Sequence, residues 1–267
     1  MECSWCQIFF PREVTIIELL APWRIPEKEL CPQCAQRFTV IDWQSCCPTC
    51  GKKDTISCSD CLFWAKTCPM IHLQHRALFA YDQGMKAWIH EYKLMGNYQL
   101  RETFAAAIRQ KINNFEYDCL IPIPLSAERY QQRGFNQVTA VLDAAGVKSQ
   151  EWLDKVVDTA PQAQRSRKQR LEEAQPFAVK PDVACEIKGK KLLLIDDVYT
   201  TGRTLYHAAE ALQTYEQFGP LKAGIEQLNG PIEPEDQLLV EAVKAAEAAE
   251  VIVLTFGEQF MESGEGA

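Results

Sequence analysis

One segment near residue 200 constrains the fold more than any other part of the chain. It reads KGKKLLLIDDVYTTGRTLYHAAEAL and begins with the apolar run Leu192 to Ile195, which predicts a buried strand. Two acidic residues, a turn rich in threonine and glycine, and a helical pattern follow. A strand, loop and helix in this order predict an α/β fold with its site at the carboxyl end of the strand.

The loop of this segment is suited to holding a phosphate group. Backbone amides at a helix start attract anions, and Gly202 lets the backbone approach one closely. Asp196 and Asp197 follow the strand, where they could accept hydrogen bonds from the hydroxyls of an attached sugar; alternatively they cap the helix. The predicted phosphate-binding set is Asp196, Asp197, Thr200, Thr201, Gly202, Arg203 and Thr204.

These residues carry a family resemblance. IDDVYTTGRT resembles the fingerprint with which type I phosphoribosyltransferases bind 5-phosphoribosyl 1-pyrophosphate (PRPP). The upstream segments IPIPLS, at 121–126, and RGFNQ, at 133–137, are similar to those of the competence protein F (ComF) family, and the resemblance covers Met1 to about Leu212. It implies a phosphoribosyltransferase-like parallel sheet flanked by helices, with a small cysteine-rich zinc module at the N-terminus.

The resemblance also assigns further parts of the site. A loop for pyrophosphate would contain Pro124, Leu125, Ser126, Arg129 and Arg133, while Asn136 either binds ligand or caps the next helix. A basic segment between the motifs resembles the mobile hood of transferases; its cations are Arg165, Arg167, Lys168 and Arg170. Such a hood would close over the diphosphate, although the segment could instead be a solvated helix face.

Cysteine spacing predicts metal binding in the first 70 residues. Ten of the twelve cysteines lie within the first 68 positions. Eight of these form four CxxC pairs: Cys3 with Cys6, Cys31 with Cys34, Cys47 with Cys50, and Cys58 with Cys61. Two such pairs complete a closed tetrahedral zinc site. The simplest arrangement joins successive pairs around two structural zinc ions and leaves Cys46 and Cys68 as spare ligands, but other pairings are open.

The surface of this zinc module has two interpretations. Trp5, Trp23, Trp43 and Trp64 alternate with lysines and arginines, a pattern that can grip nucleic acid or protein. The same tryptophans could instead shield a small core around the metals.

Charge is distributed unevenly over the chain. The net charge is −8, yet residues from His207 onward contain twelve acids against Lys222 and Lys244, so residues 1–206 are near neutral. We expect a zinc module over 1–70, a phosphoribosyltransferase-like domain over 71–219 and an acidic extension over 220–267. The extension should form a helix over 235–250 and a strand over 251–256, which either completes the sheet or belongs to a foreign appendage.

The resemblance implies a role in natural transformation, at the cytoplasmic side of the DNA-import machinery. The expected partners are PRPP or another phosphate-rich ligand, with Mg²⁺ bridging the charges, single-stranded DNA, and a helicase-like ATPase of the ComFA type. The alternative is an active PRPP-dependent transferase of nucleotide salvage whose acceptor is unknown, with Tyr199 and Tyr206 as candidate contacts. No apolar stretch is long enough for a membrane span.

Overall fold

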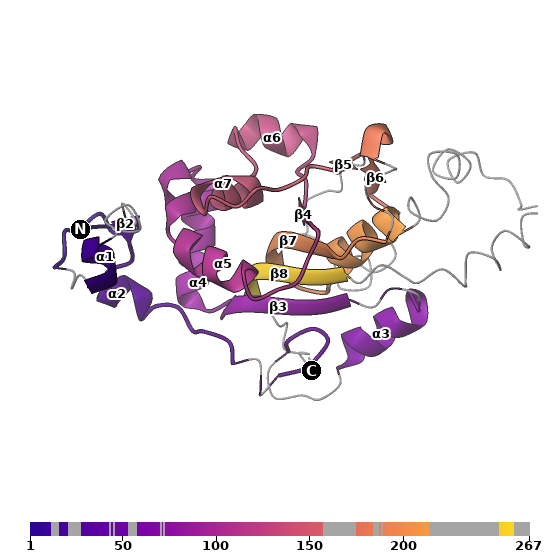
Figure 1. Cartoon of the computed structure of the whole chain (residues 1–267), viewed down its shortest axis with the longest axis horizontal. Helices are drawn as coiled ribbons and strands as arrows, with labels where there is room; N and C mark the ends of the chain where they lie inside the picture. Colours follow the sequence, from indigo (N-terminus) through magenta and orange to yellow (C-terminus); the bar gives the residue numbers. More distant parts are fainter. Residues whose placement is uncertain are drawn as a thin grey trace, which may run out of the picture.

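The computed structural model describes residues 1–11, 16–20, 28–42, 44, 46–52, 58–69, 71, 73–156, 175–183, 187, 189–213 and 251–258. Helices surround a central parallel sheet, which confirms the predicted α/β class (Figure 1). The N-terminal region contains two groups of four cysteines. In this part of the chain, no helix combines the length and apolarity that crossing a membrane requires. The hood segment and the helix predicted over 235–250 lie outside the described residues.

The sheet contains four parallel strands in the order β3-β8-β7-β4. They are β3 (Leu73–Ala80), β4 (Cys119–Pro122), β7 (Leu192–Tyr199) and β8 (Val251–Glu258). In the register, Pro122 is opposite Ile195 and Asp196 is opposite Thr255. The carboxyl ends of β4 and β7 therefore meet at one edge, which brings the IPIPLS segment beside the two aspartates.

The C-terminal strand is an integral part of this sheet. β8 pairs along its length with β3 on one side and β7 on the other, and the side chains of Leu254, Thr255 and Phe256 are fully buried. The strand predicted over 251–256 thus lies inside the sheet, not in an appendage beyond it.

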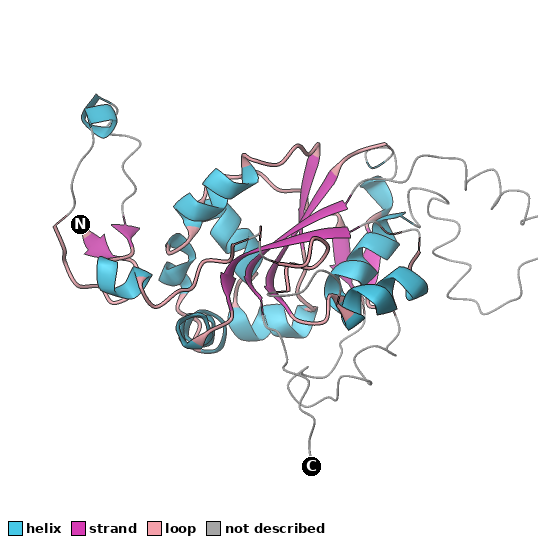
Figure 2. Ribbon diagram, turned by 90° about the horizontal axis from the view of Figure 1, so that it is seen from below, coloured by secondary structure: helices cyan, strands magenta, loops and turns pink. Residues whose placement is uncertain are grey.

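Alternating residues of β7 divide the core between the two faces of the sheet. Leu193 and Ile195 pack in one cluster with α4 (Gln83–Ile89), α5 (Ala105–Ile112) and α7 (Gln137–Ala144). Leu192 and Leu194 pack in the other with α3 (Ser59–Thr67) and a helix over 203–213. Because the strand is covered on both faces, it is apolar without alternation, as in other parallel sheets (Figure 2).

The remaining elements are short. The N-terminal part contains β1 (Glu2–Cys3), α1 (Ile16–Leu20), β2 (Lys28–Glu29) and α2 (Pro32–Ala35). Beyond α4 follow a π-helix (His90–Leu94), 3₁₀ helices (Tyr98–Glu102 and Pro181–Val183), α6 (Ala127–Arg133) and the antiparallel pair β5 (Leu153–Lys155) and β6 (Phe177–Val179).

The two cysteine groups belong to different core clusters. Cys3, Cys31 and Cys34 belong to the core cluster that contains α4, α5 and α7, whereas Cys47, Cys50 and Cys58 belong to the cluster with α3 and the 203–213 helix. Both groups therefore share apolar cores with the sheet. The domain boundaries at residues 70 and 219 stay predictions.

Candidate functional site

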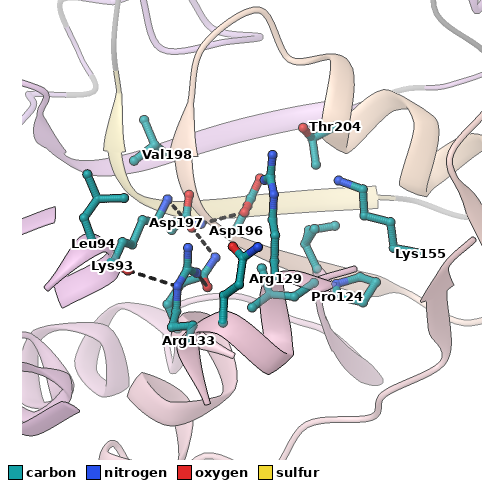
Figure 3. A pocket seen from close by; sticks show the side chains of 14 residues that line it. Lys93, Leu94, Pro124, Arg129, Arg133, Lys155, Asp196, Asp197, Val198 and Thr204 are labelled. Carbon is teal, nitrogen blue, oxygen red and sulfur yellow. Dashed lines mark hydrogen bonds and ion pairs between the residues drawn. The ribbon is translucent and has the colours of Figure 1, made fainter. Parts of the chain in front are cut away.

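A polar pocket of about 470 Å³ opens at the carboxyl ends of β4 and β7 (Figure 3). Its most informative feature is charge: four cationic side chains surround two carboxylates, which leaves a positive excess suited to an anionic ligand. The lining residues are Lys93, Leu94, Ile123, Pro124, Leu125, Arg129, Gln132, Arg133, Gln137, Lys155, Asp196, Asp197, Val198 and Thr204.

The two aspartates are placed by β7 and are almost completely buried. Asp196 is 8% and Asp197 7% exposed, and the backbone N–H of Asp197 donates to Oδ1 of Asp196 at 2.8 Å. Burial, together with the neighbouring carboxylate of Asp197, raises the pKa of Asp196 to about 7. One acid of the pair is thus near its titration point at neutral pH.

The carboxylate of Asp197 has two partners that the sequence did not predict. The Nζ atom of Lys93 lies 2.5 Å from its Oδ2 atom, and the side-chain amide of Gln137 donates to the same oxygen. Lys93 belongs to the π-helix that follows α4, an irregular form often found at functional sites. Its backbone carbonyl accepts from Nε of Arg133 at 3.2 Å, which links this segment to α6.

The structure brings most of the residues predicted for the pyrophosphate loop to one pocket, and their role there stays a prediction. Pro124, Leu125, Arg129 and Arg133 line the pocket. Ser126 does not; it is 1% exposed and caps α6, where its hydroxyl accepts from the Arg129 N–H at 3.4 Å. The described backbone contains no cis peptide bond, so Pro124 is held in a trans peptide.

Asn136 is a cap, the second of its two predicted roles. Its Oδ1 atom accepts from the Val138 N–H at 2.8 Å at the start of α7. Its Nδ2 atom donates to the Ile123 carbonyl at 3.1 Å. The residue therefore fixes the β4 loop against α7 and contributes no group to the pocket lining.

Of the threonine-rich loop, only Thr204 reaches the pocket lining. Thr201 and Arg203 are buried, at 6% exposure each, and Thr200 and Gly202 lie outside the lining as well. Gly202 has φ +79°, a left-handed conformation in which glycine alone is unstrained. The turn thus needs Gly202 for its backbone angles, and the helix over 203–213 begins directly after it.

Lys155, in β5, is a further cation of the pocket lining, and it belongs to none of the sequence motifs. The predicted hood cations Arg165, Arg167, Lys168 and Arg170 lie outside the described residues, between β5 and β6. Tyr199 and Tyr206, the candidate acceptor contacts, point elsewhere: Tyr199 stacks on His75 and Tyr206 on Trp64, and neither lines the pocket.

The cysteines gather in the predicted sequential arrangement. The first cluster contains Cys3, Cys6, Cys31 and Cys34, and the second contains Cys47, Cys50, Cys58 and Cys61; the four Sγ atoms of each lie within 4.8 Å of one another. Cys46 and Cys68 belong to neither.

The spacing of the thiols fits a tetrahedral zinc ion. Zn–S bonds of about 2.3 Å place sulfurs about 3.8 Å apart. The Sγ atoms of Cys6 and Cys31, and those of Cys47 and Cys61, are 3.8 Å apart, and those of Cys50 and Cys58 are 3.4 Å apart. Each cluster could hold one zinc ion through four thiolates.

Comparisons with known proteins agree with these motifs. The chain is 35% identical to competence protein ComFC of Streptococcus pneumoniae over 214 residues, which cover 80% of this chain and 94% of the relative. It is 28% identical to competence protein ComFC of Bacillus subtilis, over 79% of this chain and 88% of the relative, and 25% identical to competence protein F of Haemophilus influenzae, over 76% and 89%. No family model matches the chain.

Among solved structures, the allosteric regulatory enzyme of purine biosynthesis matches 58% of this chain and 25% of that chain, with 15% identity and a TM-score of 0.25. That score is too low to support a conclusion. The sequence relationship is strong enough without it: the chain belongs to the ComFC family of competence proteins.

Proposed function

We propose that this protein binds PRPP, or a similarly phosphorylated ribose, in the pocket between β4 and β7 as part of the competence system for DNA uptake. The observation that carries the proposal is the arrangement of charge: two buried carboxylates lie among four cations, next to a glycine turn that begins a helix. A phosphorylated sugar presents both anionic and hydroxyl groups, and this pocket offers partners for both.

Each group of residues has a role in this proposal. Arg129 and Arg133 project from α6 into the pocket, where guanidinium groups can neutralise a diphosphate (Figure 3). Asp196 and Asp197 accept hydrogen bonds from ribose hydroxyls. The amides and hydroxyls at the start of the 203–213 helix receive the 5-phosphate. The role expected of the hood cations Arg165, Arg167, Lys168 and Arg170 stays a prediction, because they lie outside the described residues.

The diphosphate of the ligand is a better binding site for Mg²⁺ than the two aspartates of the protein. The ammonium group of Lys93 already neutralises Asp197, so a divalent cation on that carboxylate would have to displace it. We therefore assign Mg²⁺, when present, to the diphosphate itself, whose charge it would lower. Zinc fits both cysteine clusters, and because these sites are closed by four thiolates its role there is structural.

The family relationship supports the cellular part of the proposal. Relatives named competence proteins match about four fifths of the chain. We infer that the protein works at the cytoplasmic side of the import machinery, where it binds incoming single-stranded DNA and a ComFA-type helicase-like ATPase.

The alternative is catalysis of phosphoribosyl transfer in nucleotide salvage. A nucleobase acceptor would normally be held by stacking, yet no aromatic side chain lines the pocket among the described residues. This favours ligand binding over transfer to a base.

Calorimetric titration tests the proposal. PRPP with Mg²⁺ should bind to the intact protein. Arg129→Ala should lower the affinity for PRPP by about tenfold or more, because a charge-assisted contact is lost. Single-stranded DNA should then be titrated with and without PRPP, and pyrophosphate release should be followed with nucleobases present. Failure of PRPP and pyrophosphate to bind would refute the site, whereas base-dependent pyrophosphate release would establish the transferase alternative.

A further inference from the structure

A buried hydrogen bond joins the second cysteine cluster to the threonine-rich loop. Cys58 caps α3 and Cys61 lies in its first turn, and Trp64 follows one turn later on the same side of the helix. The Trp64 side chain is 3% exposed, and its Nε1–H donates to the backbone carbonyl of Thr201 at 2.7 Å. A residue of the cysteine-rich region is thus in direct contact with the proposed phosphate loop.

This bond fixes the orientation of the peptide group that joins Thr201 to Gly202. In a trans peptide the carbonyl and the following N–H point in opposite directions. Because the Thr201 carbonyl is turned toward Trp64, the Gly202 N–H is turned away from it. Gly202 is itself buried and comes directly before the helix over 203–213, so the orientation of this peptide sets how the start of that helix, with Thr204 in the pocket lining, is presented to an anion.

The same indole ring also supports the helix behind the loop. The rings of Trp64 and Tyr206 are stacked, with centroids 4.5 Å apart and planes 9° apart. Tyr206 lies in the first turn of the 203–213 helix, and its backbone N–H donates to the Gly202 carbonyl at 2.9 Å. Trp64 therefore contacts both the turn and the helix that begins after it.

A second path connects the same cluster to the same turn. The Nδ1 atom of His75 lies 2.7 Å from the Cys50 carbonyl, and since a carbonyl only accepts, Nδ1 is the protonated nitrogen. The His75 ring stacks on Tyr199 with centroids 4.0 Å apart. The Tyr199 hydroxyl in turn lies against Gly202, where a Cβ would come within 2.6 Å of it.

We propose that Trp64 is a positioning residue for the phosphate loop, through which the second cysteine cluster holds the Thr201–Gly202 turn and the helix start that carries Thr204 at the edge of the pocket. The inference rests on the proposed binding of a phosphorylated ligand. The first cluster belongs to the other core, with α4 and α5, and its Trp5 indole N–H donates to Glu91 of the π-helix and not to the Thr201–Gly202 turn. By linkage, ligand binding stabilises the second cluster as much as the cluster stabilises the bound loop.

The test compares two tryptophans that differ in one hydrogen bond. Trp64→Phe keeps an aromatic ring but removes the N–H donor. Trp88→Phe is the matched control, because Trp88 is fully buried and its Nε1 atom has no hydrogen-bond partner among the described residues. We expect Trp64→Phe to weaken pyrophosphate and PRPP binding roughly tenfold with unchanged zinc content, and Trp88→Phe to leave affinity as in the wild type.

Two results separate this inference from the proposed function. If the wild-type protein binds neither pyrophosphate nor PRPP, the proposed function fails. If it binds them and both tryptophan variants bind equally well, only the positioning role is overturned.

A measurement on the wild-type protein covers the case in which Trp64→Phe does not fold. Zinc release to a chromogenic chelator should be followed with and without saturating pyrophosphate, with Cys34→Ser and Cys61→Ser used to assign the two ions. Pyrophosphate should slow release from the second cluster severalfold and leave the first unchanged. Equal release rates with and without the ligand would overturn the coupling.

Discussion

The Nζ atom of Lys93 lies 2.5 Å from Oδ2 of Asp197, with both side chains mostly shielded from water at 19% and 9% exposure. This ion pair places a cation beside carboxylates that would otherwise repel an anionic ligand. At such burial the pair is screened less by salt than a surface pair would be.

Lys93→Gln should therefore weaken binding of PRPP by about tenfold and make it more dependent on Mg²⁺, since the carboxylates lose their counter-charge. Calorimetry at several magnesium concentrations measures both effects.

Lys148→Gln, at an exposed position away from the pocket, serves as the control for loss of one positive charge. Equal affinities of the two variants would contradict the role given to the ion pair.

Ionisation of Asp196 should lower the free energy of unfolding as the pH rises. Its pKa is raised to about 7, so between about pH 4 and 7 the folded state holds a proton that the unfolded chain has lost. The free energy of unfolding contributed by this group therefore decreases as pH rises through that window. His75 acts in the opposite direction, because burial lowers its pKa to about 3.

A comparison with Asp196→Asn isolates the effect, because His75 is common to both proteins. Asparagine keeps the oxygen that accepts from the Asp197 N–H. Urea unfolding from pH 5 to 8 should show wild-type stability falling relative to the variant as pH rises. A constant difference over this range would show that Asp196 is ionised throughout.

Sequence-based predictions were most successful where a structural feature depends only on residues that are close together in the chain. The run from Leu192 to Gly202 predicted the strand, the turn and the paired aspartates, because apolar burial and the left-handed glycine are local requirements. CxxC spacing likewise predicted the cysteine clusters, since two thiols separated by two residues must lie close together.

Other features depend on tertiary contacts that no local pattern encodes. Lys93 lies in an irregular π-helix and reaches Asp197 only because α4 and β7 pack together. Lys155 enters the pocket from a three-residue strand. Trp64 was recognised as an aromatic of the cysteine-rich region, but its contact with Thr201 spans 137 positions and could not be predicted from spacing.

Removal of the C-terminal strand should unfold the α/β part of the protein. β8 separates β3 from β7, and its loss would remove the fully buried side chains of Leu254 and Phe256 from the core and leave two strand edges unpaired. Truncation after Gly219 should abolish the cooperative thermal transition, whereas truncation after Glu258, which retains β8, should preserve it. A truncated protein with an unchanged melting temperature would show that the strand is dispensable.

The two cysteine clusters should each hold one zinc ion. Elemental analysis of the native protein should give about two zinc ions per chain, and Cys34→Ser and Cys61→Ser should each lose about one. Because both clusters pack into apolar cores shared with the sheet, chelation should lower the melting temperature of the whole protein. A metal-free protein with the native melting temperature would remove the structural role of zinc.

Gly202→Val should abolish PRPP binding for two reasons that can be separated. A side chain at φ +79° strains the backbone, and its Cβ would lie 2.6 Å from the Tyr199 hydroxyl, which displaces the turn. Gly189→Val is the matched control: φ there is +68°, but a Cβ meets no atom of the described residues within 4 Å. Both variants should lose some thermal stability, and calorimetry should show that only Gly202→Val loses PRPP. Normal PRPP binding by that variant would mean that the ligand does not contact this turn.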